Sequence, residues 1–289
     1  MIEYLKQLVK AEKWGEVQAY AERMAAERAI KTDEMAVVYC AIVQARFVLG
    51  DLGGAVAAGE VALQLARSVG DWDSYCISAN ALGAAHSMLK QYNAAVLYFE
   101  DYLNNVHRAA PFPELHSNVW YNLALVYKAL GEGPKAIEAL KHALEQALLT
   151  GDARRVHAMI LTLVDASLKA GQMNDVPRLL AKSAFFLRRR SISDVQETAL
   201  YHLAYRTEYA LLTGRLRRAR ILAAKGLLAA EERYRHLCSF HMLLSRISRE
   251  YKAGSEALEH ALSARACAVA CQRPDLEADA TAVVNQLLG

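Results

Sequence analysis

A glycine recurs along this chain at a spacing close to 40 residues, each time just after a stretch of helical hydrophobic periodicity. The five copies are Gly50, Gly131, Gly171, Gly214 and Gly254. Successive gaps are 81, 40, 43 and 40 residues, and the gap of 81 is two periods with Lys90 at the missing midpoint. A fixed period of this size indicates an array of stacked structural repeats.

The residues around each glycine predict a helical hairpin. Ala or Val follows a few residues later and opens a second amphipathic stretch, as Ala55 does after Gly50 and Ala136 after Gly131. A glycine at such a junction supplies the left-handed backbone that ends one helix and turns the chain into the next. No sustained alternation of period two is bounded by turn residues, so no sheet is predicted. The fold class is therefore all-α, a solenoid of stacked antiparallel helix pairs.

One repeat carries a more specific pattern. It reads Trp120-x2-Leu123-Ala124-x2-Tyr127, then Gly131, then Ala136-x3-Leu140-x2-Ala143. The repeat before it offers Leu82-Gly83, Tyr92 and Ala95-x3-Phe99. This pattern resembles the tetratricopeptide repeat (TPR), in which small residues let two helices approach closely and large ones fill the gaps around them.

The period here is longer than the usual 34 residues. It is similar to the long-repeat branch found in kinesin light chains, G-protein-signalling modulators, MalT-like regulators and peptide-pheromone receptors. The resemblance implies a right-handed superhelical solenoid forming a single domain over residues 1–289, with about seven units and a C-terminal capping helix. The expected units are 1–32, 34–71, 74–110, 114–151, 153–190, 194–233 and 236–273, followed by the cap at 275–288.

Members of this branch mostly bind extended peptides or protein segments in a concave groove lined by the first helix of each pair. The resemblance places the following side chains in that groove: Gln44, Phe47, Asn80, Ser87, Met88, Asn118, Tyr121, Asn122, Lys128, Asp165, Lys169, Glu208 and Arg246. The three asparagines are the most informative, because an amide offers donor and acceptor together and can pair with any peptide backbone. The alternatives are an amide bonded to a neighbouring helix and, for Phe47 and Tyr121, aromatic rings that belong to the core.

Charge is unevenly distributed. Residues 1–150 hold 13 Lys and Arg against 17 Asp and Glu, whereas the remainder holds 21 against 14. The excess gathers in Arg188, Arg189, Arg190, Arg215, Arg217 and Arg218, a candidate patch for an acidic partner. The alternative is a solvated helix face on the convex side. Nucleic acid is not the expected partner, because no helix-turn-helix and no interleaved aromatic residues accompany the arginines.

The sequence carries none of the phosphate-loop, dinucleotide, nucleophile-elbow or zinc-protease motifs. We therefore predict a protein that is not an enzyme, with no catalytic residue, metal or cofactor. Cys267 and Cys271 lie one helical turn apart and are expected to be buried structural residues. Five cysteines without a Cys-x-x-Cys pair, together with the charged residues that follow Met1, favour a cytoplasmic location and no membrane segment.

The favoured function is a scaffold or adaptor whose concave groove holds an extended peptide or partner segment. The alternative is a ligand-responsive receptor similar to the pheromone-receptor or MalT-like group. Because the repeat begins almost at Met1, such a receptor is expected to act with an effector in trans. Self-association through the N-terminal end is a further expectation, since Ile2, Leu5, Leu8 and Val9 have no obvious cover there.

Overall fold

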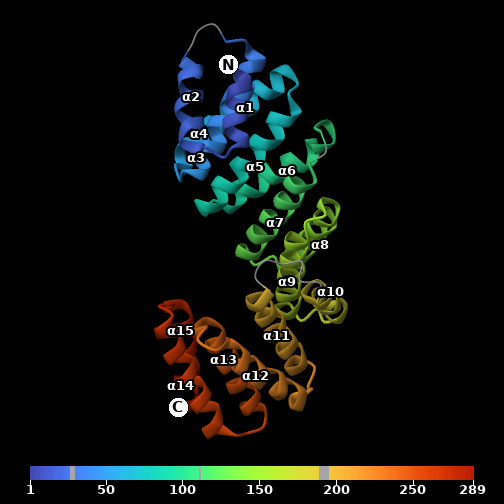
Figure 1. The fold of residues 1–289 in the computed structure, drawn as a ribbon, viewed down its shortest axis with the longest axis vertical. Coiled ribbons are helices and arrows are strands. Elements are labelled where there is room, and N and C mark those ends of the chain that lie inside the picture. The colour runs from blue at the N-terminus through green and yellow to red at the C-terminus, as the bar shows by residue number, and fades with distance from the viewer. Residues whose placement is uncertain (27–29, 111, 189–194) are drawn as a thin grey trace. The chain divides into compact units, whose positions relative to one another are not determined.

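The computed structural model of this chain describes residues 1–26, 30–110, 112–188 and 195–289. Within these ranges the chain is helical and contains no strand, as the repeat predicts. It divides into two compact units, Met1–Gly151 and Asp152–Gly289 (Figure 1). No helix of the described ranges combines the length and apolar character that crossing a membrane requires.

The unit Met1–Gly151 consists of eight α-helices and one 3-10 turn in its described residues. They are α1 (Ile2–Lys10), α2 (Trp14–Ala26), α3 (Thr32–Val48), α4 (Leu52–Val69), α5 (Trp72–Met88), α6 (Tyr92–Asn105), η1 (Val106–Arg108), α7 (Pro113–Ala129) and α8 (Gly133–Thr150). Each helix packs on the next in the chain, and α3 and α5 also contact each other directly. These are the contacts of stacked helix pairs.

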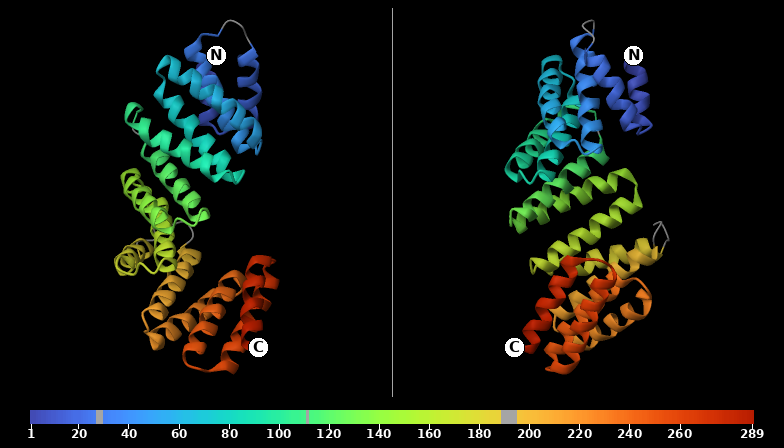
Figure 2. Two further views of the ribbon diagram at one scale, coloured as in Figure 1. Left: turned by 180° about the vertical axis from the view of Figure 1, so that it is seen from behind. Right: turned by 90° about the vertical axis from the view of Figure 1, so that its left-hand side faces the viewer.

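The unit Asp152–Gly289 continues the pattern. Its helices are α9 (Ala153–Lys169), α10 (Val176–Arg188), α11 (Val195–Leu212), α12 (Leu216–Ala230), α13 (Tyr234–Glu250), α14 (Gly254–Ala270) and α15 (Pro274–Leu288). The final helix α15 lies beside α14 and closes this unit (Figures 1 and 2). The border between the two units falls at the expected junction of repeats 114–151 and 153–190, and a single domain over 1–289 stays a prediction.

The turns explain the spacing of the glycines. Gly50, Gly131, Gly171 and Gly214 have positive φ of 70° to 85°, and Lys90, at the midpoint that lacks a glycine, has φ of 60°. The prediction for Gly254 is wrong, because Gly254 begins α14 and Lys252 takes the left-handed conformation with φ of 58°. Sequence periodicity locates such a turn to within two residues, and a lysine can take the place of glycine at a modest cost in strain.

Close packing of neighbouring helices rests on glycines that face aromatic rings. Gly83 on α5 faces Phe99 on α6 of the same pair, whereas Gly226 on α12 faces Phe240 on α13 of the next pair. A Cβ on Gly83 would lie 2.6 Å from Cε1 of Phe99, and a Cβ on Gly226 would lie 2.1 Å from Cε1 of Phe240. Phe99 and Phe240 are fully buried. Both units therefore use the small-against-large contact that the TPR pattern implies.

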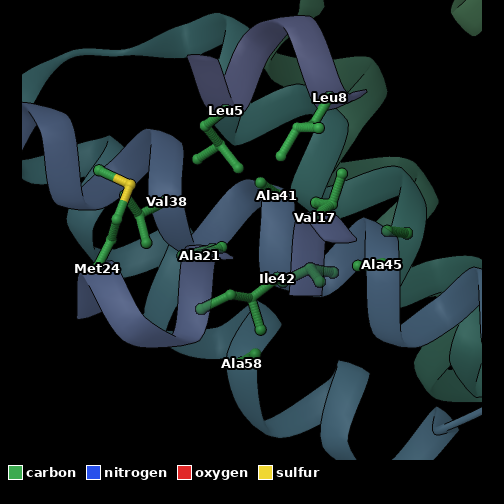
Figure 3. Packing of buried hydrophobic residues seen from close by; sticks show 13 residues of the cluster. Leu5, Leu8, Val17, Ala21, Met24, Val38, Ala41, Ile42, Ala45 and Ala58 are labelled. Carbon is green, nitrogen blue, oxygen red and sulfur yellow. The ribbon is translucent and has the colours of Figure 1, made fainter. Parts of the chain in front are cut away.

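The N-terminal helices bury their apolar side chains within their own unit. Leu5 and Leu8 are directed toward Ala41 on α3 and Val17 on α2 (Figure 3). Leu5 is fully buried and Leu8 is nearly so. The expectation that these two leucines lie uncovered is wrong, because the amphipathic α1 turns its apolar face onto α2 and α3. Ile2 and Val9 are only partly buried, and self-association through this end stays a prediction.

Candidate functional site

A groove with a volume of about 700 Å³ lies within the unit Met1–Gly151. Three helices supply most of its lining, and each is the first helix of a pair: α3, α5 and α7. The lining residues on each helix recur at intervals of three, four or seven, which places them on one helical face. On α7, for example, these are Leu115, Asn118, Asn122 and Leu125.

Amide and hydroxyl groups make up the polar part of the lining. They come from Gln44, Asn80, Ser87, Asn118 and Asn122. The side-chain oxygen of Asn80 is buried and has no hydrogen-bond partner among the described residues. Gln44 donates from Nε2 to the carbonyl oxygen of Cys40 over 3.3 Å, within its own helix. A buried polar atom without a partner lowers the stability of the folded state by about 1 to 3 kcal/mol. A ligand that donates a hydrogen bond to the Asn80 oxygen would therefore recover part of this free energy.

The rest of the lining is apolar and partly exposed. It includes Trp14, Phe47, Ile77, Met88 and Phe112, and 61% of Met88 is accessible to solvent. None of the described lining residues is charged. The groove therefore offers apolar contact and neutral hydrogen bonding, which is the surface that an uncharged extended chain can match.

Seven of the residues expected in the groove line it together: Gln44, Phe47, Asn80, Ser87, Met88, Asn118 and Asn122. Tyr121 and Lys128 also lie on α7 but are not among the residues that line this groove. That the seven residues bind a peptide stays a prediction.

The lining also includes residues that the sequence did not place in the groove, among them Trp14, Val48, Ala81, Phe112 and Leu115. Trp14 begins α2, in the partial first repeat where the pattern gives no register, and Phe112 lies in the connector before α7. The only signal for Val48 and Leu115 is the helical interval that separates them from Gln44 and Asn118.

The expected groove residues of the second unit pair with each other. Lys169 donates from Nζ to Asp165 Oδ2 over 2.8 Å along α9. Arg246 on α13 donates to Glu208 on α11 over 3.1 Å. Each of these four side chains thus has a partner within the chain, and their role in binding a ligand stays a prediction.

The arginine patch divides in the structure. Arg189 and Arg190 lie outside the described residues. Arg188, Arg215 and Arg218 line a pocket of about 450 Å³ between α10, α11 and the start of α12, whereas Arg217 lies outside it. Arg217 lines a neighbouring hollow at the start of α12, to which Arg215 and Arg218 also contribute. Arg206 joins the pocket from α11, which the sequence did not reveal.

A buried polar chain lies beside this pocket. The Ser183 hydroxyl sits 2.7 Å from Nε2 of His157 and 2.8 Å from Nδ1 of His202, and all three residues are buried. Burial, helped by the neighbouring charge of Arg206, lowers the pKa of His202 to about 4. Burial also lowers the pKa of His157. Both imidazoles are therefore neutral near pH 7.

A second pair of neighbouring histidines lies between α13 and α14. Nδ1 of His241 lies 3.2 Å from Nδ1 of His260. Cys267 and Cys271 are partly buried, less than the buried structural cysteines expected from the sequence. Cys267 lies on α14 and packs against buried residues of α13, α14 and α15, whereas Cys271 follows the end of α14. Among the described residues no group of three or more His, Cys, Asp or Glu is placed to hold a metal ion.

Comparison with known proteins identifies the fold. No protein-family model matches the sequence, and no curated protein matches it. Solved structures of TPR proteins do match, so the fold is TPR-like. The C-terminal part of a TPR repeat-containing protein from Cytophaga hutchinsonii is 9% identical over 92% of this chain and 95% of its own, with a TM-score of 0.62.

Two further structures share this fold. The apo form of RapI is 13% identical and aligns over 99% of this chain and 97% of its own, with a TM-score of 0.58. NprR in complex with its cognate peptide NprX is 12% identical over 99% of this chain and 81% of its own, with a TM-score of 0.54. At such low sequence identity, structural similarity establishes the architecture alone. Any function therefore has to be argued from the residues of this chain.

Proposed function

We propose that the groove of Met1–Gly151 binds an extended, uncharged peptide or partner segment, and that the chain is a non-catalytic interaction scaffold. The observation that carries the proposal is the buried Asn80 oxygen without a partner, in a groove that also holds the amides of Asn118, Asn122 and Gln44. The similarity to NprR, whose structure contains its cognate peptide, supports the same kind of occupant.

The chemistry of the lining favours a peptide main chain over a small polar molecule. An extended peptide carries an unpaired N–H and C=O at each residue, and a side-chain amide can satisfy either group. The oxygen of Asn80 has no hydrogen-bond partner among the described residues, so it can accept a hydrogen bond from a peptide N–H. Apolar side chains of the peptide then alternate onto surfaces such as those of Phe47 and Met88.

The absence of charge in the described lining predicts the composition of the ligand. A charged side chain that enters this groove loses water and gains no ionic partner from the lining. Peptides selected by the groove should therefore be poor in Asp, Glu, Lys and Arg at the positions that it covers.

A displayed library of random 12-residue peptides tests the proposal. The wild-type chain should enrich a defined set of peptides, and the double variant Asn80→Ala, Asn122→Ala should bind them about 10- to 100-fold more weakly, as the loss of two hydrogen bonds of about 1 kcal/mol or slightly more each implies. Binding is measured by fluorescence anisotropy with the enriched peptides.

The matched control is Asn93→Ala, which removes an exposed amide from α6 away from the groove. This variant should bind like the wild type, and far-UV circular dichroism should show equal helicity in all three proteins. Equal retention of the peptides by the double variant and the wild type would show that the amides take no part, and the groove assignment would be withdrawn.

A further inference from the structure

The pocket of the second unit gathers positive charge around a small volume. Four arginines line it: Arg188 at the end of α10, Arg206 on α11, and Arg215 and Arg218 at the start of α12. Arg215 and Arg218 are three residues apart and share a helical face. No acidic side chain is among the described residues of the lining. We refer to it below as the arginine pocket.

These four guanidinium groups differ from the other arginines nearby. In the part of the chain that the structure describes, none of them forms an ion pair with a carboxylate. By contrast, Arg220 on the same helix α12 donates to Glu256 over 2.6 Å, and Arg246 pairs with Glu208. Like charges held around one cavity repel each other, and the repulsion is screened least for the half-buried Arg206.

The remaining lining suits the organic part of a ligand. Pro177, Leu180 and Ala184 supply apolar contact, and the ring of Tyr209 lines the same cavity. His202 lies on the wall with Nδ1 engaged by Ser183, and its low pKa keeps it neutral. The volume of about 450 Å³ is within the range typical of small-molecule sites, roughly 300 to 1,000 Å³.

From this arrangement we infer that the arginine pocket binds a small phosphorylated molecule. The planar guanidinium forms paired hydrogen bonds with phosphate oxygens, and several guanidiniums converge here on one cavity. A phosphoryl group carries between one and two negative charges at pH 7, which neutralises more of the clustered arginine charge than a single carboxylate does. The site is separate from the groove of Met1–Gly151, and its chemistry is opposite.

Isothermal titration calorimetry with pyrophosphate, inorganic phosphate and ADP tests the inference. Pyrophosphate or ADP should bind to the wild type, and Arg206→Gln or Arg218→Gln should weaken binding at least tenfold. Arg206→Lys keeps the charge but loses the planar fork, so it should give an intermediate loss. If ADP binds more tightly than pyrophosphate, the apolar wall contacts the organic part.

The matched control is Arg217→Gln. It removes the same charge from the residue next to Arg218, but Arg217 lies outside the arginine pocket. An equal loss of affinity in Arg217→Gln and Arg218→Gln would show diffuse surface attraction and overturn the inference. So would the failure of all three phosphates to bind at 1 mM in low salt. Tighter binding of a poly-glutamate peptide than of pyrophosphate would assign the surface to an acidic protein instead.

Discussion

The two units of this chain build hollows of opposite character from the same kind of helix pair. The groove of Met1–Gly151 is lined by amides and apolar side chains with no charge among its described residues. The arginine pocket of Asp152–Gly289 is lined by four guanidinium groups. The packing residues are alike, as Gly83 against Phe99 and Gly226 against Phe240 show. In a repeat fold, therefore, the residues between helices fix the architecture, and the lining residues are free to set the chemistry.

The units also differ in how they treat buried polar groups. The first leaves the Asn80 oxygen without a partner on the wall of its groove. The second joins His157, Ser183 and His202 into a hydrogen-bonded chain. The three tryptophans, Trp14, Trp72 and Trp120, all belong to the first unit. Tryptophan fluorescence therefore follows residues 1–151 alone, whereas circular dichroism follows the helices of both units.

The largest expected difference between the units is their response to acid. His202 has a pKa of about 4 in the folded protein against an ordinary value of 6.5, so the folded state binds fewer protons than the unfolded state in that interval. The stability present above pH 6.5 is lost as the pH falls toward 4, by about 2 to 3 kcal/mol at pH 4.5. Urea unfolding followed by circular dichroism at pH 7.5 and 4.5 measures the loss.

The variant His202→Gln removes this titration and should reduce the acid-induced loss by most of that amount. Charged and titratable groups that act on His202 are Arg206 and His157, and neither changes in the variant. An unchanged dependence on pH in His202→Gln would assign the acid sensitivity to other groups. Half-buried His116 also has a pKa lowered by burial, so the unfolding followed by tryptophan fluorescence in the first unit should depend on pH as well, but less.

A smaller effect on stability is expected when Gly83, which packs against Phe99, is replaced by a larger residue. Gly83→Ala should destabilise the first unit by about 2 kcal/mol, since the new Cβ meets the buried Phe99 ring. Tryptophan fluorescence during urea unfolding gives the change. Gly53→Ala is the matched control, because Gly53 lies in α4 with no heavy atom within 4 Å of an added Cβ. That variant should be neutral or gain up to about 1 kcal/mol from helix propensity.

The smallest expected effect concerns the charge of the arginine pocket. Without ligand, Arg206→Met should leave the second unit as stable as the wild type or raise its stability by about 0.5 kcal/mol, because repulsion among the guanidiniums falls. Circular dichroism in phosphate-free buffer at low salt provides the measurement. A loss greater than about 1 kcal/mol would mean that Arg206 holds the fold together, which is the ordinary role of a paired arginine.

Much of the architecture follows from the sequence, because repeat period, turn residues and small-against-large pairs are local or periodic. Lys90 shows how far this extends, since its place in the period alone predicted its left-handed turn. The site residues were harder to predict. Spacing along a helix shows which residues share a face, but it does not show how far the helix is rotated about its axis relative to the neighbouring helices. Tyr121 was expected in the groove beside Asn122, and the structure places only Asn122 there. Arg206 was not assigned to the arginine patch, because its partners in the pocket lie on other helices.

The hydroxyl of Ser183 couples the protonation of two histidine rings in the second unit. It carries a single proton and faces a ring nitrogen on each side, Nε2 of His157 and Nδ1 of His202. If it donates to one imidazole, the other must present its N–H to the oxygen, so the tautomers of the two rings are correlated. The three residues come from α9, α10 and α11. The orientation of the Ser183 hydroxyl therefore couples the tautomers of two histidines on different helices, and nitrogen chemical shifts of the two rings would reveal this coupling.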